Sequence, residues 1–107
     1  MGLYDLKTIL QNAREEKYCV PAFDASTINM AQAIIQAAEE EKSPVIIMGL
    51  KVDLEGEMLD YWIKSVRDMG EKASVPVCIH LDHAVDMDLL KKCCDIGSVS
   101  YTHLTLP

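Results

Sequence analysis

The stretch that decides the fold runs from Val75 to His83 and reads VPVCIHLDH. Its first residues form an apolar run, which predicts a buried β-strand. The strand ends in two imidazoles and a carboxylate, from His80, Asp82 and His83. Active sites of α/β proteins lie at the carboxyl ends of parallel strands. This strand end is therefore the first candidate site.

The rest of the chain alternates helical and strand patterns. Apolar spacing predicts helices over residues 6–16, 28–41, 54–72 and 87–95. Apolar runs predict strands over residues 18–23, 45–48 and 76–81. Helices and strands that alternate at intervals of about 30 residues are typical of βαβ units around a parallel sheet. The pattern predicts an α/β fold, either a doubly wound sheet or the first units of a (β/α)8 barrel.

The ends and faces of these helices follow from local chemistry. Asp5 is expected to cap the first helix, Ser26 or Thr27 to cap the second, and Gly97 to end the fourth. One side of the second helix is apolar and is expected to pack on the sheet, through Met30, Ala33, Ile34, Ala37 and Ala38.

Composition narrows the class of protein. The chain has 107 residues, 50% of them hydrophobic, and a net charge of −7. That length suits one small domain, and the acidic balance argues against nucleic-acid binding. No apolar run approaches the roughly 20 residues that a membrane helix needs. The sequence has no signal peptide at its start, so a cytoplasmic location is expected. In that location the four cysteines are expected to be reduced and to be buried as small apolar side chains.

Several ordered stretches then carry a family resemblance. They are AFD at residues 22–24, QAIIQAAEE at 32–40, KSPVII at 42–47, VPV at 75–77 and HLDH at 80–83. Together they resemble the amino-terminal part of the class II, zinc-dependent fructose-bisphosphate aldolases and the related tagatose-bisphosphate aldolases. The likeness covers about residues 3–97.

The resemblance implies a (β/α)8 barrel of which this chain carries the first βα units, truncated before closure. It implies that Asp82 is the catalytic proton-transfer group and that His83 is one ligand of a catalytic Zn2+. The substrate would be a phosphorylated ketose, fructose or tagatose 1,6-bisphosphate, cleaved reversibly to dihydroxyacetone phosphate and glyceraldehyde 3-phosphate. Zinc polarises the ketone in such chemistry. His80 is expected to support the site, and the full-length family member is expected to be a homo-oligomer.

Three departures from the family pattern stand out. The family commonly has asparagine where Asp24 stands, and a serine-containing segment of small residues where Leu50 and Lys51 stand. The remaining zinc ligands and phosphate loops come from later strands in the family, so the fragment is expected to be inactive. Residues 1–97 are thus the expected aldolase part, and residues 98–107 an expected non-native tail, with a divergent fourth strand as the alternative.

Two other interpretations stay open, one of the strand end and one of the whole chain. The polar end of the strand could cap the following helix, for which Asp86 is suitable. The chain could also be a non-catalytic α/β module that binds a protein partner through its sheet edge or its acidic helices.

Overall fold

The computed structural model describes residues 2–50, 56–82, 87–96 and 100–101. Four helices lie in these ranges: α1 (Leu6–Glu16), α2 (Ile28–Glu40), α3 (Glu57–Lys72) and α4 (Met87–Ile96). Four strands alternate with them: β1 (Ala22–Asp24), β2 (Val45–Leu50), β3 (Val77–Asp82) and β4 (Ser100–Tyr101). The predicted order of helices and strands is confirmed from α1 to α4, whereas β4 lies in the segment expected to be a non-native tail.

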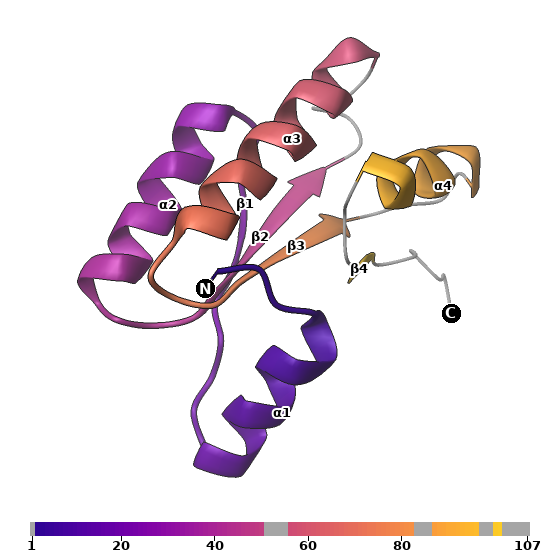
Figure 1. Cartoon of the computed structure of the whole chain (residues 1–107). Coiled ribbons are helices and arrows are strands. Elements are labelled where there is room, and N and C mark those ends of the chain that lie inside the picture. The colour runs from indigo at the N-terminus through magenta and orange to yellow at the C-terminus, as the bar shows by residue number, and fades with distance from the viewer. Residues whose placement is uncertain (1, 51–55, 83–86, 97–99, 102–107) are drawn as a thin grey trace.

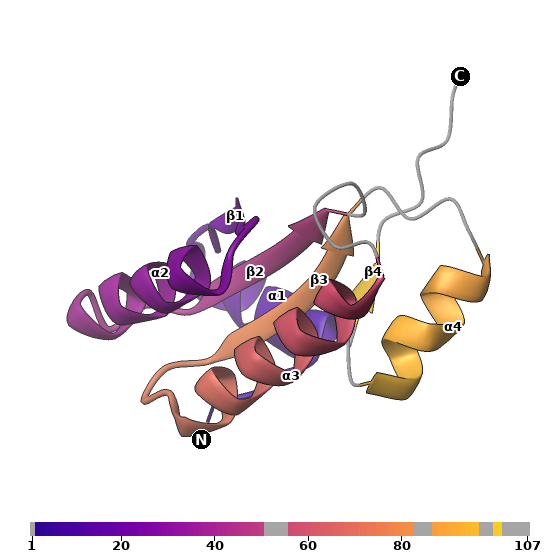
Figure 2. The same cartoon turned by 90° about the horizontal axis from the view of Figure 1, so that it is seen from above.

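The strands form one parallel sheet in the order β1-β2-β3-β4. Helices α2 and α3 pack side by side on one face, and α1 lies against the other face (Figures 1 and 2). The main core lies between the sheet and α2 and α3, with Ile47, Trp62, Val66 and Ile79 among its buried members. A smaller cluster joins Ile9 of α1 to the other face of the sheet.

The amino-terminal segment is attached to the start of β3. Tyr4 N–H donates to the Val77 carbonyl at 2.9 Å, and Val77 N–H donates to the Gly2 carbonyl at 2.7 Å. Gly2 has a φ of +83°, and an added Cβ would lie 1.8 Å from the Gly70 carbonyl oxygen. Only glycine fits this close approach. The segment continues into α1, which lies on the face of the sheet opposite α2.

Two predicted helix caps are confirmed, and the first strand is shorter than predicted. The Asp5 carboxylate accepts from Thr8 N–H at 2.6 Å, and the Thr27 hydroxyl oxygen accepts from Met30 N–H at 3.1 Å. The predicted strand over 18–23 begins only at Ala22. Ala22 already lies opposite Ile46, near the start of β2, so earlier residues have no strand to pair with. The predicted start of α3 at residue 54 and the Gly97 cap lie outside the described residues.

The predicted buried face of α2 is wrong by part of a turn. The helix buries Ala31, Ile35 and Ala38, whereas Met30 is 43% exposed and Ala33 and Ala37 are also exposed. The prediction considered the sheet alone. Because α2 also packs against α3, its buried stripe is shared between the sheet and that helix.

The cysteines follow their positions in the fold. All four are free, Cys78 and Cys93 are buried, and Cys19 and Cys94 are exposed, so the expected burial is wrong for two of them. Cys19 precedes β1, and Cys94 follows Cys93 by about 100° around α4. Burial raises the pKa of the Cys93 thiol to about 11, so it stays protonated at neutral pH.

Part of the carboxyl-terminal segment extends the sheet. Ser100 and Tyr101 form β4 and lie opposite His80 and Leu81 of β3. The rest of the expected tail, residues 98–99 and 102–107, lies outside the described residues. Across the described ranges, no helix has the length and apolar character that crossing a bilayer requires.

Candidate active site

Alternate side chains of β3 point to opposite faces of the sheet. One set lies in the main core beneath α2 and α3: Val77, Ile79 and Leu81. The other set lies on the opposite face: Cys78, His80 and Asp82. Of these, Cys78 packs with Ile9 and Ile46 under α1, whereas Asp82 is the last residue of the strand and is half-buried. The chemistry-bearing residues of β3 therefore share the face that α2 and α3 leave open.

The strand register brings a second carboxylate onto the same face. Met48 lies opposite His80 on β3 and opposite Asp24 on β1. Paired residues of parallel strands point to the same face, so Asp24, Met48 and His80 form one row across the sheet. Asp82 is one row further toward the carboxyl ends of the strands, opposite Leu50.

His80 is a buried imidazole whose pKa is influenced by two carboxylates, those of Asp82 and Asp24. Its side chain is 7% exposed. Burial lowers the pKa of His80 below its ordinary value of 6.5, and the negative charges of Asp82 and Asp24 oppose part of that shift. The ring is therefore neutral at pH 7, with one N–H donor and one acceptor nitrogen. It can orient a neighbouring polar group without adding a positive charge to the site.

The lowered pKa of His80 makes stability depend on pH. Below 6.5, the unfolded chain binds a proton at this side chain before the folded chain does. The contribution of neutral His80 to the stability of the folded chain is therefore complete above pH 6.5. It is lost as the pH falls toward the lowered pKa that His80 has in the folded chain. We expect the urea concentration at the unfolding midpoint to decrease as the pH is lowered from about 7.5 to about 5.5, the range in which histidine titrates. His80→Asn should flatten this dependence, and an unchanged slope in that variant would contradict the assignment to His80.

The described residues do not form a complete metal centre. His83, Lys51 and Asp86 lie outside the described residues, so the metal-ligand and cap predictions stay predictions. Within the described ranges, no group of three or more His, Cys, Asp or Glu side chains is placed to hold a metal ion. A catalytic zinc site needs three protein ligands and an open position. The described donors do not fit that requirement by themselves.

Sequence reasoning treated Asp24 only as a departure from a family pattern, and missed that it lies on the row of His80. The sequence held a partial signal, because Asp24 directly follows the strand predicted over residues 18–23. The carboxyl ends of parallel strands lie at one edge of the sheet, but β1 ends one row before β3, so Asp24 lies in the row of His80 and not in that of Asp82. Only the alignment of β1 with β2 shows which residue of each strand reaches that edge.

The comparisons with known proteins agree with this geometry. The family model "Fructose-bisphosphate aldolase class-II" matches residues 4–102. The solved YdjI aldolase from Escherichia coli K12 superposes with a TM-score of 0.87 at 29% identity, over 94% of this chain and 38% of that one. The predicted architecture, the first βα units of an aldolase barrel, is confirmed by this match.

Two curated relatives are equally similar and differ in their named activity. The 6-phospho-5-dehydro-2-deoxy-D-gluconate aldolase of Halalkalibacterium halodurans is 36% identical over 104 residues, 94% of this chain and 36% of its own length. The fructose-bisphosphate aldolase of Geobacillus stearothermophilus has the same identity and coverage, 36% over 104 residues. This chain thus spans about a third of each relative. The family match over residues 4–102, with the fold and strand-end geometry described above, shows that the chain belongs to the class II fructose-bisphosphate aldolase family.

Proposed function

We propose that this chain supplies the proton-transfer group and one zinc ligand of a ketose-bisphosphate aldolase. Asp82 exchanges a proton with the hydroxyl group of the substrate next to the carbon–carbon bond that breaks. His83 is one protein ligand of the Zn2+, and the other ligands come from strands that the described residues do not include. Class II aldolases are metal-dependent enzymes.

The position of Asp82 carries this proposal. It is the last residue of β3, half-buried, and on the face that the outer helices α2 and α3 leave open. A carboxylate there is accessible to a substrate and is held by a strand whose other face is in the core. General acid–base groups need this combination of access and fixed position.

His80 supports the same assignment. It is on the same face of β3 as Asp82, and the Asp82 charge acts on its pKa. The neutral ring keeps one donor and one acceptor nitrogen on the face of the strand that carries Asp82. We infer that His80 positions Asp82 and takes no part in proton transfer to the substrate.

The substrate we propose is a phosphorylated ketose, fructose or tagatose 1,6-bisphosphate. Family membership supports an aldol cleavage. The two relatives described above are equally identical to this chain in sequence, but their names give different sugars. Asp24, in the row of His80, is the residue of this site that we expect to influence the choice of sugar.

A chimaera tests the proposal. Residues 4–102 of this chain replace the matching segment of the Geobacillus stearothermophilus aldolase, whose remaining two thirds supply the other strands. We expect the chimaera to cleave at least one of the two ketose bisphosphates. The 107-residue chain alone should show no turnover above background, because an incomplete ligand set does not make a catalytic zinc site.

Each of these two expectations has a result that would contradict it. Turnover by the isolated chain would contradict the expected inactivity. A chimaera that folds, binds zinc and cleaves neither sugar would contradict the proposed substrate class.

A further inference from the structure

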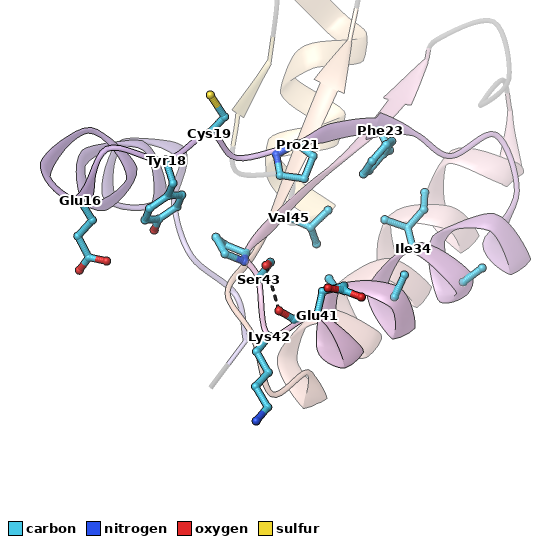
Figure 3. A pocket seen from close by; sticks show the side chains of 14 residues that line it. Glu16, Tyr18, Cys19, Pro21, Phe23, Ile34, Glu41, Lys42, Ser43 and Val45 are labelled. Carbon is cyan, nitrogen blue, oxygen red and sulfur yellow. Dashed lines mark hydrogen bonds between the residues drawn. The ribbon is translucent and has the colours of Figure 1, made fainter.

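Asp24 is an exposed carboxylate on the face of the sheet that carries the candidate active site. The residue before it, Phe23, lines an apolar groove between β1 and α2 (Figure 3). Neighbouring residues of a strand point to opposite faces, so Asp24 points to the face of His80 and Asp82. All three residues of β1 are exposed, Asp24 among them. Its carboxylate can therefore meet a ligand that is bound at Asp82.

The backbone at Asp24 is held in place by the residue that follows it. Ala25 is 1% exposed, and its N–H donates to the Met48 carbonyl at 2.9 Å. The Ala25 carbonyl accepts from Trp62 Nε1–H in the main core at 2.8 Å. An exposed side chain beside such an anchored residue is accessible and yet keeps its position. Groups that recognise a ligand need both properties.

The strand register sets the distance between Asp24 and the proposed proton-transfer group. Asp24 is aligned with His80, on the next strand but one, and Asp82 follows His80 by two residues. Strand spacing and rise per residue put the backbones of Asp24 and Asp82 roughly 12 Å apart. Two aspartate side chains, each with a hydrogen bond of about 2.7 Å, span most of that distance from its two ends. The two carboxylates can therefore bind hydroxyl groups on neighbouring carbons of one substrate.

The residue between Asp24 and His80 in this row is suited to the carbon chain of such a substrate. Met48 is half-buried, so part of its side chain is accessible on the same face. A thioether side chain offers an apolar contact and adapts to the shape of its neighbour. The row thus places an apolar contact beside a carboxylate, as a chain of carbons with one hydroxyl group requires.

The sugars named above differ at a carbon next to the reacting hydroxyl group. Counted from the ketone, the reacting hydroxyl is on the second carbon, and the bond that breaks joins the first and second carbons. Fructose and tagatose 1,6-bisphosphate carry a hydroxyl on the third carbon, in the half that leaves as the aldehyde. In 6-phospho-5-dehydro-2-deoxy-D-gluconate the third carbon is the one named 2-deoxy and carries none. Both classes of sugar have a hydroxyl on the first carbon, so only the third distinguishes them.

We propose that Asp24 determines the choice of sugar by accepting a hydrogen bond from the hydroxyl group on this third carbon, an inference that rests on the proposed function. An ionised carboxylate only accepts hydrogen bonds, so it matches a hydroxyl donor and gains nothing from a methylene group. Asp82 then acts on the reacting hydroxyl, and Asp24 recognises its neighbour. The site prefers ketose bisphosphates of the fructose or tagatose type to 2-deoxy sugars.

Aldol synthesis by the chimaera described above tests the proposal with two acceptor aldehydes. Glyceraldehyde 3-phosphate carries the hydroxyl in question, and 3-phosphopropanal is the same aldehyde without it. Dihydroxyacetone phosphate is the second substrate, and the measured quantity is the ratio of kcat/KM for the first aldehyde to that for the second. Asp24→Ala should lower this ratio by about tenfold or more, because it removes one hydrogen bond to a charged group.

Asp24→Asn is a second variant that keeps the shape of the side chain. Its amide oxygen still accepts a hydrogen bond but lacks the charge, so the ratio should fall part of the way. Asp68→Ala is the matched control and should leave the ratio unchanged, because Asp68 is an exposed carboxylate on α3, which packs on the opposite face. Far-UV circular dichroism and zinc content are compared for every variant. If Asp24→Ala does not fold, Asp24→Asn decides.

Two results would count against the proposal in different ways. An unchanged ratio in both Asp24 variants, including an equal loss of kcat/KM for the two aldehydes, would show that Asp24 does not bind this hydroxyl. The activity of the chimaera would then still support the proposed function. A folded, zinc-loaded chimaera that uses neither aldehyde would overturn the proposed function, and this inference with it.

Discussion

Replacement of Trp62 by alanine is expected to remove a large part of the free energy of unfolding of this chain. Trp62 is 2% exposed in the core between α3 and the sheet, and its Nε1–H donates to the Ala25 carbonyl at 2.8 Å. Loss of a buried Trp side chain costs roughly 3–5 kcal/mol, and small domains have about 5–15 kcal/mol in total. Urea unfolding followed by far-UV circular dichroism measures the loss.

Two further substitutions divide the effect of Trp62. Trp62→Phe keeps most of the ring but leaves the Ala25 carbonyl without its donor, which should cost about 1–3 kcal/mol. Tyr61→Ala alters the neighbouring aromatic residue, which is 56% exposed, and should change stability by less than about 1 kcal/mol. Equal losses for Trp62→Ala and Tyr61→Ala would mean that Trp62 is not a core residue.

The second large effect is on catalysis. In the chimaera with the Geobacillus stearothermophilus aldolase, Asp82→Asn should lower kcat by about 10²–10⁴-fold and leave KM nearly unchanged, because an amide still fits the site but cannot exchange the proton. Steady-state cleavage of the ketose bisphosphate measures both constants. Zinc content, determined by metal analysis, should equal that of the unsubstituted chimaera.

Asp68→Asn provides the matched control for Asp82→Asn. Asp68 is an exposed carboxylate on α3 whose Oδ2 lies 2.8 Å from the Lys72 ammonium. Exposed ion pairs contribute little to stability, so this variant should stay folded. Because α3 packs on the face of the sheet opposite to Asp82, the variant should also keep the kcat of the chimaera. A chimaera whose kcat survives Asp82→Asn would refute proton transfer by Asp82 while leaving family membership intact.

Much of the architecture was predictable because it depends on short-range patterns. The apolar run before His80 predicts β3. Asp5 predicts the start of the first helix and Ser26 or Thr27 that of the second, and hydrogen bonds confirm Asp5 and Thr27 as the caps. These features need only neighbours a few residues away in the sequence. The strand end with Asp82 was identified in the same way.

Other features depend on residues that are distant in the sequence. β1 begins at Ala22 because its partner on β2 begins near Ile46, 24 residues later. The buried face of α2 depends on α3, which helical periodicity within α2 cannot show. Cys19 is exposed because β1 begins after it.

The sequence by itself determined the alternation of helices and strands and the polar end of β3, because hydrophobic periodicity and capping act within one or two turns of chain. The tertiary structure decided that Asp24 joins the row of His80, that His80 is buried and neutral, and that an apolar groove stays open beside β1. Strand register and helix packing set these features. Both depend on the free energy of burial summed over segments that meet only when the chain folds.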